Sequence, residues 1–207
     1  MQESPQNEKT PFYPRSPYGV AKLYAYWIVV NYREAFIIFA CNGILFNHES
    51  EFRGEQFVTK KIVRSAVRIA AGFDEVLSLG NIYAERDWGY AGDYMDGVIR
   101  VMERYEPDDY VFATGKLHSV KDFVSTTFRH VGIDLDWSGD GLDEIARNRS
   151  SQNLVVKIDK HFYRPGDIKG TCGDAAKAKL LLGWEPQTNL SSIISKMISH
   201  EQDTTLP

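Results

Sequence analysis

Residues 14–22 read Pro14-Arg15-Ser16-Pro17-Tyr18-Gly19-Val20-Ala21-Lys22. Ser16 is a typical N-cap and Pro17 suits the first position of a helix, so this stretch predicts the start of a helix. Tyr18 and Lys22 are four residues apart and therefore share one face of that helix. An ammonium group beside a phenol favours the phenolate, which can accept a proton from a hydroxyl as hydride leaves the same carbon. The stretch predicts a proton-transfer pair.

A purely structural role for the pair is also open. Any two residues can fall four apart, and the same predicted helix carries Tyr24, Tyr26, Trp27 and Tyr32, which favour packing. The spacing alone does not decide between the two roles.

The composition is that of an average soluble globular protein, with 43% hydrophobic and 25% charged residues among 207. The net charge of −4 argues against a protein that binds nucleic acid through its phosphates. Two cysteines form no disulfide framework and favour a reducing compartment. The sequence shows no apolar run long enough for a membrane span and no hydrophobic signal sequence, so we expect a cytoplasmic protein that binds neither nucleic acid nor membrane.

Predicted strands alternate with predicted helices, which indicates an α/β fold. The early part of residues 36–46 is apolar on both faces, as in a buried parallel strand. Ser119 and Asp122 are spaced as a capping box at a helix start. Further strands are expected at 76–80, 110–115, 135–137 and 154–158, and helices at about 16–35, 57–71, 94–105, 119–131, 174–182 and 190–200.

A dinucleotide-binding half begins with a strand and a glycine-rich turn, Gly-x-Gly-x-x-Gly or similar. No such turn occurs in these residues, and Gly139-Asp140-Gly141 stands without a matching strand and helix. If the chain handles a dinucleotide, we expect it to hold only the later part of the site.

The residues from Pro11 to Lys22, followed by the segment from Ala40 to Ser50, closely resemble the GDP-mannose 4,6-dehydratase family of extended short-chain dehydrogenase/reductases. Tyr-x-x-x-Lys alone would indicate only the superfamily, whereas Asn42 to Ser50 is far more specific. Further matches follow in family order at Arg53-Gly54-Glu55, Phe57-Val58-Thr59, Leu79-Gly80-Asn81, Arg86-Asp87-Trp88-Gly89, Phe162-Tyr163-Arg164-Pro165 and Leu182-Gly183-Trp184.

The resemblance implies a partial Rossmann-like parallel sheet, the C-terminal half of an extended short-chain dehydrogenase/reductase, plus a smaller α/β substrate-binding domain. Elements of the Rossmann half, about 16–46 and 93–115, would be interleaved with substrate-domain elements, about 47–92 and 116–200. The resemblance further implies a homo-oligomer for the full-length protein.

The resemblance also implies roles for individual residues. Tyr18 and Lys22 would be catalytic and contact the cofactor NADP, together with His48 and Arg53. The substrate GDP-mannose would be bound by Asn47, Val58, Lys61, Arg64, Arg86 and Arg164; no metal is implied. Arginine suits the anionic ligand because its planar fork meets phosphate oxygens in pairs. Each of these charges taken singly could instead be a solvated surface group.

The implied reaction is that of a lyase. It converts GDP-mannose to GDP-4-keto-6-deoxymannose, a step toward GDP-fucose, by internal hydride transfer through NADP and loss of water. The family's Thr/Ser-x-Glu catalytic pair has no counterpart here, so we expect this chain alone to be inactive.

Three alternatives remain open. One is another extended-family sugar-nucleotide epimerase or reductase, and a second is a non-catalytic fragment that partners an intact subunit. The third is a truncated product that does not fold, in which apolar residues such as Ile37, Ile38 and Phe39 would be exposed.

Overall fold

The computed structural model describes residues 2–163 and 170–205 and divides into two compact units. Unit 1 comprises Met1–His48, Arg86–Leu117 and Gly170–Thr188, and unit 2 comprises Glu49–Glu85, His118–Lys169 and Asn189–Pro207. Each unit is therefore assembled from three separate segments of the chain.

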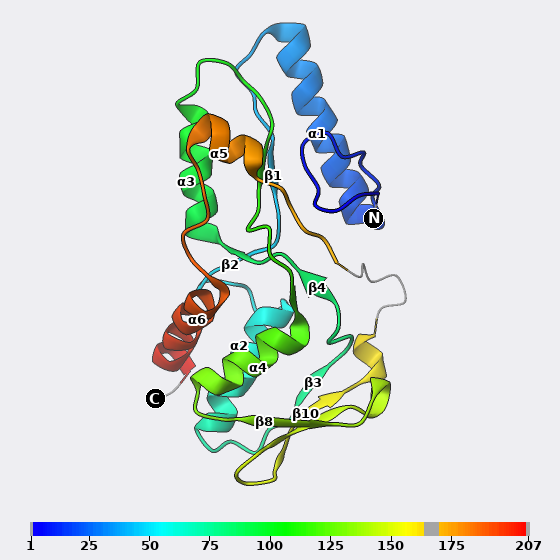
Figure 1. Cartoon of the computed structure of the whole chain (residues 1–207), viewed down its shortest axis with the longest axis vertical. Coiled ribbons are helices and arrows are strands. Elements are labelled where there is room, and N and C mark those ends of the chain that lie inside the picture. Colours follow the sequence, from blue (N-terminus) through cyan, green and yellow to red (C-terminus); the bar gives the residue numbers. More distant parts are fainter. Residues whose placement is uncertain (1, 164–169, 206–207) are drawn as a thin grey trace. The chain divides into compact units, whose positions relative to one another are not determined.

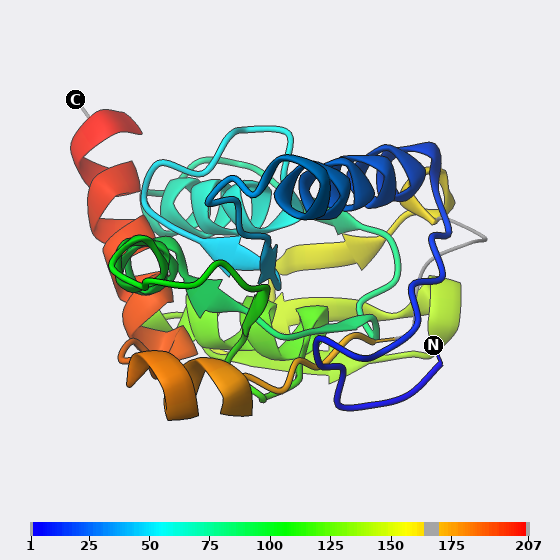
Figure 2. The ribbon, with the colours of Figure 1, turned by 90° about the horizontal axis from the view of Figure 1, so that it is seen from above.

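Unit 1 is built on a parallel pair of short strands, β1 (Gly43–Leu45) and β6 (Tyr110–Phe112), with Gly43 opposite Tyr110. Figures 1 and 2 show α1 (Pro17–Phe36) on one side of this pair, and α3 (Ala91–Met102) and α5 (Ala176–Leu182) on the other. Of four further two-residue strands, β5 (Gly89–Tyr90) lies in unit 1 and β7 (His118–Ser119) in unit 2, while β2 (His48–Glu49) and β4 (Glu85–Arg86) each have one residue in either unit.

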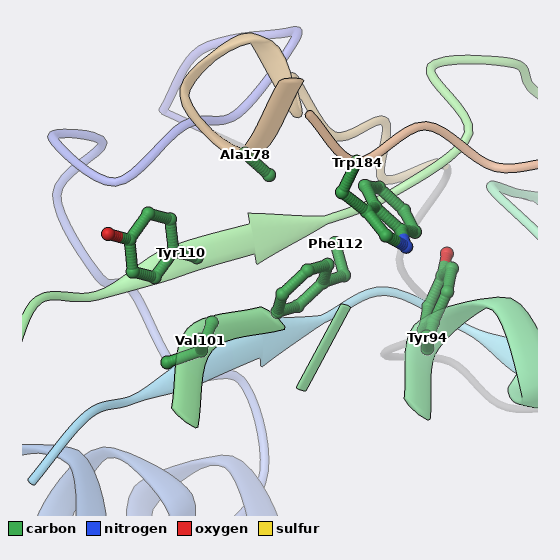
Figure 3. Close-up of a cluster of buried hydrophobic side chains, with 6 residues drawn as sticks. All are labelled: Tyr94, Val101, Tyr110, Phe112, Ala178 and Trp184. Carbon is green, nitrogen blue, oxygen red and sulfur yellow. The ribbon is translucent and has the colours of Figure 1, made fainter. Parts of the chain in front are cut away.

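The core of unit 1 lies between β6, α3 and α5. Phe112 and Trp184 meet edge to face with ring centroids 4.9 Å apart, and Tyr94 packs on Trp184 at 5.7 Å. The indole of Trp184 donates to the carbonyl of Asp93 at 2.7 Å, which satisfies its buried N–H. Figure 3 shows this cluster, formed by Tyr94, Val101, Tyr110, Phe112, Ala178 and Trp184.

Helix α1 is attached to unit 1 by polar contacts rather than by apolar burial. None of its residues is buried. Instead, Asp109, just before β6, accepts hydrogen bonds from Arg33, from the Tyr26 hydroxyl and from the backbone and side chain of Asn42. This carboxylate therefore joins the helix to the starts of both strands.

Unit 2 is a four-stranded sheet covered by three helices. The strand order is β3-β10-β9-β8, with β3 and β10 parallel and the other pairs antiparallel. Helices α2 and α4 pack on the sheet, and α6 packs against both (Figure 1). The elements are α2 (Val58–Ala70), β3 (Leu77–Leu79), α4 (Val120–His130), β8 (Leu135–Ser138), η1 (Gly141–Asp143), β9 (Ile145–Asn148), β10 (Leu154–Ile158), η2 (Lys160–Phe162) and α6 (Leu190–Thr205).

The core of unit 2 comes from apolar positions at helical spacing. Ile62 and Ala66 of α2, Phe123 of α4, and Ile193 and Met197 of α6 are all buried. Between α2 and α6, the buried Lys60 pairs with the buried Glu201, so the charges at this contact are matched.

Most predicted helices are confirmed, and so is the capping box. Ser119 accepts from the Asp122 amide at 3.0 Å and Asp122 accepts from the Ser119 amide at 3.0 Å. The helix predicted from Asp174 begins at Ala176, where the Asp174 side chain accepts the amide at 2.9 Å.

Two predictions on strands are wrong. Residues 36–42 do not form a buried strand: Phe36 ends α1, Ile37 is left-handed and 92% exposed, and the register with β6 runs only from Gly43 to Leu45. Between the strands expected at 135–137 and 154–158, where no strand was predicted, the structure has β9, whose alternating burial is weak and which pairs with β8 on one side and β10 on the other.

Candidate functional site

Tyr18 and Lys22 lie together on the first turns of α1. The Ser16 side chain accepts the Gly19 amide at 3.0 Å and Pro17 occupies the first turn, as the sequence predicts. The Lys22 ammonium lies 5.5 Å from the centroid of the Tyr18 ring, and the phenol is 72% exposed. The pair is therefore assembled by the helix itself and its polar ends face outward.

Asn47 and His48 follow β1 in unit 1, at the carboxyl end of a parallel strand, where ligands bind in such sheets. The Asn47 carbonyl accepts the Gly89 amide at 2.9 Å, and the residue is exposed. Nδ1 of His48 lies 2.9 Å from the Phe46 carbonyl, so the imidazole is oriented by its own strand end. Its ring is 5.4 Å from the ring of Tyr94.

Tyr94 is fully buried, yet its hydroxyl has no hydrogen-bond partner among the described residues. Burial, together with the charges of Asp87 and Asp93, raises the pKa of this phenol well above its ordinary value. A neutral phenol therefore stands next to the imidazole of His48.

Arg86 precedes a buried turn that joins three segments of unit 1. The carboxylate of Asp87 is fully buried and accepts from the amides of Gly115 and Gly173 and from both the amide and the hydroxyl of Thr114. These bonds fix the turn after Arg86 against the loop that follows β6.

Arg53 lies in unit 2, in the loop before α2. Its Nε is 3.0 Å from Oε2 of Glu49, and its guanidinium carbon lies 3.4 Å from the centroid of the Phe57 ring. The same Glu49 oxygen accepts from the Thr59 hydroxyl at 2.8 Å. Burial raises the pKa of Glu49 to about 7, while the Arg53 charge and the Thr59 hydrogen bond oppose the rise.

The other predicted residues of unit 2 lie along α2. Val58 is its first residue and is 41% exposed. The Lys61 ammonium donates to the Ser78 carbonyl at 2.7 Å and lies 3.8 Å from the Phe162 ring centroid; its burial lowers its pKa. Arg64 is exposed and pairs with Glu55. Arg164 lies outside the described residues.

The predicted residues thus form two groups, each described within its own unit: Tyr18, Lys22, Asn47, His48 and Arg86 in unit 1, and Arg53, Val58, Lys61 and Arg64 in unit 2. Within residues 2–163 and 170–205, no group of three or more His, Cys, Asp or Glu side chains could hold a metal ion, and no helix is long and apolar enough to cross a membrane.

A pocket of about 560 Å³ in unit 1 contains none of the predicted residues. Its lining includes Asp108, which pairs with Lys177 at 2.6 Å, and Asp109, which pairs with Arg33. We assign this pocket no ligand, because these carboxylates already have partners.

The family model described as GDP-mannose 4,6 dehydratase matches residues 1–197. The chain belongs to the GDP-mannose 4,6-dehydratase family. GDP-mannose 4,6 dehydratase 2 of Caenorhabditis elegans is 49% identical over 201 residues, which cover 97% of this chain and 52% of the relative. The chain therefore spans about half the length of the curated relatives it matches.

Solved structures share the fold at lower identity. RMD from Pseudomonas aeruginosa, complexed with NADPH, superposes with a TM-score of 0.79 at 18% identity over 97% of this chain and 60% of its own. The dTDP-glucose 4,6-dehydratase of Bacillus anthracis, in complex with NAD, gives 0.77 at 15% identity over 99% and 58%. The expected α/β fold of the extended short-chain dehydrogenase/reductases is confirmed.

The sequence of this GDP-mannose 4,6-dehydratase family member did not predict Glu49 and Thr59, the residues that hold Arg53 in place. Glu49 lies four residues before Arg53, a spacing that brings side chains together only where the chain turns helically. In a loop that spacing carries no such meaning, and Thr59 lies in a different element. The one signal in the sequence is that Glu49 is an acidic residue inside the family-specific segment from Asn42 to Ser50.

Proposed function

We propose that this chain carries the proton-transfer pair and part of the ligand site of a GDP-mannose 4,6-dehydratase, whose reaction yields GDP-4-keto-6-deoxymannose. The observation that carries the proposal is the placement of Tyr18 and Lys22 on the first turns of α1, with their polar ends exposed. An exposed phenol four residues from a lysine contributes little to packing, so its use lies in contact with a ligand.

In the proposed reaction, the phenolate of Tyr18 accepts the proton of the sugar 4-hydroxyl. Lys22 stabilises that phenolate and binds the ribose of the cofactor. When bound, NADP⁺ would supply a hydride acceptor for C4 and, once reduced, the hydride donor for C6 after water has left. The ketone formed at C4 makes the C5–H acidic. Removal of the C5 proton, as water leaves from C6, requires a further base.

The residues of unit 2 fit an anionic cofactor or substrate. Glu49 contacts Nε of Arg53, and Phe57 covers one face of its guanidinium. The two terminal nitrogens are not used by these contacts, and their planar fork suits a phosphate. We assign His48 and Arg53 to NADP. The choice of NADP rests on the family resemblance; among the similar solved structures, RMD binds NADPH and the dTDP-glucose 4,6-dehydratase binds NAD.

The substrate GDP-mannose is assigned to a second set of side chains. Asn47 offers an exposed amide, and Val58 an exposed apolar surface at the start of α2. Arginine and lysine side chains suit the diphosphate, although Lys61 and Arg64 already contact Ser78 and Glu55. The set is Asn47, Val58, Lys61, Arg64, Arg86 and Arg164.

We propose that these 207 residues alone do not turn over GDP-mannose, because the Thr/Ser-x-Glu pair has no counterpart in them. The test supplies GDP-mannose and NADP⁺ first to the purified chain and then to a fusion in which the chain replaces its counterpart in the C. elegans relative. We expect product from the fusion only, and a loss of about 100-fold or more with Y18F.

Turnover by the chain alone at the rate of the relative would overturn the proposed inactivity. An epimerised or reduced sugar nucleotide from the fusion would favour the other extended-family enzymes, and equal rates for Y18F would remove Tyr18 from the chemistry.

A second candidate, a non-catalytic chain that associates with an intact subunit, is favoured by the surface of α1. Tyr24, Trp27 and Phe36 are 70%, 55% and 64% exposed on a helix with no buried residue. Pull-down of the full-length C. elegans relative with the tagged chain tests this candidate. Absence of the relative from the bound fraction would count against it.

A further inference from the structure

The Arg53 side chain is held at two places before any ligand arrives. Its Nε is enclosed by protein and lies 3.0 Å from Oε2 of Glu49, although the N–H direction departs from hydrogen-bond geometry. The guanidinium plane rests on the ring of Phe57, at 3.4 Å from the centroid. An arginine in an exposed loop ordinarily keeps its rotamer freedom, and these two contacts remove much of it.

Glu49 is itself fixed in position, by a hydrogen bond from Thr59. Its residue is 2% exposed, and Oε2 accepts from the hydroxyl of Thr59, which is fully buried in the second position of α2. The carboxylate therefore has one fixed oxygen that serves both Thr59 and Arg53. A residue of α2 thereby sets the position of a carboxylate at the end of β2.

The arrangement leaves one part of Arg53 unused. Within residues 2–163 and 170–205, the guanidinium contacts Glu49 through Nε and the ring of Phe57 through one of its faces. The side chain is 22% exposed, so the two terminal nitrogens can reach a ligand. Two parallel N–H groups in a planar fork match the oxygens of a phosphate.

We propose that Glu49 and Thr59 are positioning residues, which lock Arg53 on Phe57 so that its terminal nitrogens form a preformed fork for a phosphate group of a nucleotide ligand. The lock consists of Glu49, Thr59 and Phe57. It acts through Arg53 and touches no ligand itself. The assignment of the ligand rests on the proposed function, whereas the lock does not.

Burial raises the pKa of Glu49 to about 7, and the nearby positive charge of Arg53 only partly offsets this rise. The Glu49 carboxylate is therefore fully charged only above about pH 7. A carboxylate buried for packing alone would be replaced at little cost by an uncharged group. Here the charge has a partner that fixes the direction of the arginine.

The first experiment observes Arg53 directly in the full chain by NMR of ¹⁵N-labelled protein. At about pH 8, above the pKa of Glu49, we expect the enclosed Arg53 Nε–H to exchange slowly with water and to give a resonance that is lost in R53K. E49Q and T59V should lose this slow exchange. T59S, which keeps the hydroxyl, and E55Q, which alters the exposed partner of Arg64, should retain it.

Circular dichroism of each variant verifies folding, and T59V tests the lock should E49Q fail to fold. If folded E49Q and T59V both keep the slow Arg53 Nε–H, Glu49 and Thr59 are merely structural and the proposal is overturned.

The second experiment titrates NADP⁺, GDP-mannose and inorganic pyrophosphate separately and follows the Arg53 resonance. We expect binding of the responding ligand to weaken about tenfold or more in E49Q, because Arg53 loses its charged partner, and to be unchanged in D136N, at an exposed position of β8. A response to NADP⁺ assigns the fork to the cofactor, and a response to GDP-mannose assigns it to the substrate.

The two ideas fail differently. If none of the three ligands moves the Arg53 resonance while E49Q still abolishes its slow exchange, the proposed role of Arg53 in binding falls and the lock stands. If a ligand binds equally well to the wild type and to E49Q, the lock has no part in binding and this inference is overturned, while the proposed function remains.

Discussion

Arg33 and Asp109, 76 residues apart in the chain, form a two-pronged ion pair in which Nη1 lies 2.8 Å from Oδ1 and Nη2 lies 3.1 Å from Oδ2. The same carboxylate is 6% exposed and accepts from Tyr26 and Asn42 as well. Helix α1 buries no residue, so it has no buried apolar face to attach it to unit 1. The ion pair between Arg33 and Asp109 provides that attachment instead. The position of the Tyr18–Lys22 pair therefore depends on Asp109.

Replacement of Asp109 by Asn should destabilise unit 1 by about 3–5 kcal/mol, because it leaves Arg33 without its buried partner. Urea unfolding measured by circular dichroism tests this. D108N is the matched control, since Asp108 forms a more exposed pair with Lys177 and should change stability by about 1 kcal/mol or less. Equal effects of the two variants would contradict the proposed attachment of α1.

Acid should weaken the same attachment. Burial opposes ionisation of Asp109, but hydrogen bonds from Arg33, Asn42 and Tyr26 hold its pKa below the ordinary value of 3.8. The unfolded state thus takes up this proton first, so the stabilisation is present above about pH 4 and is lost as pH falls through the folded pKa. The acid-induced loss of stability should be smaller in D109N, as measured by unfolding at stepwise lower pH.

Glu49 should give the opposite pH dependence in unit 2. Its folded pKa of about 7 lies above the ordinary value of 4.5, so the folded state holds a proton that the unfolded state releases. Stability therefore falls as pH rises from about 4.5 to 7, by up to about 3 kcal/mol from this group. Chemical unfolding at about pH 5 and pH 8 should show this loss in the wild type and in E55Q but not in E49Q; a loss of equal size in E49Q would refute the assignment.

Two tyrosines of α1 should respond differently to the same substitution. Y26F removes a hydrogen bond of 2.9 Å to Asp109, a contact with a charged group that is worth about 1.5–3 kcal/mol. Burial and that hydrogen bond also raise the pKa of Tyr26 to about 12, so the phenol stays protonated at neutral pH. Y18F, at an exposed position, should change thermal stability by less than about 0.5 kcal/mol. A marked loss of stability in Y18F would return Tyr18 to a structural role.

Gly97 should tolerate no side chain. A Cβ at this position of α3 would lie 2.3 Å from Cε1 of the buried Phe112. G97A should therefore cost about 1–3 kcal/mol despite the better helix propensity of alanine. D96A, on the exposed side of the same helix, is the control in a thermal unfolding comparison. A stabilised G97A would mean that the Phe112 ring moves aside freely.

Much of the local structure was predictable. The start of α1, the capping box at Ser119 and the end of α5 at Gly183, where φ is 61°, follow from residues within one turn of each other. Strand β1 was not predictable in length. Phe36 to Cys41 has the composition of a buried strand, but a strand forms only where a partner offers hydrogen bonds, and β6 offers them from Tyr110 onward.

For the candidate site, the residue types and the motif order in the sequence were enough to indicate the family, and they predict the Tyr18–Lys22 pair and the ligand-binding arginines. The contacts behind those residues were decided by the tertiary structure alone: Asp109 reaches α1 across 76–83 residues, and Glu49 is fixed by a hydroxyl on the next helix. The physical reason is the distance along the chain between the interacting residues. Caps and helix faces depend on neighbours within a few residues, whereas a buried carboxylate acquires its partners only when packing brings distant segments together and excludes water.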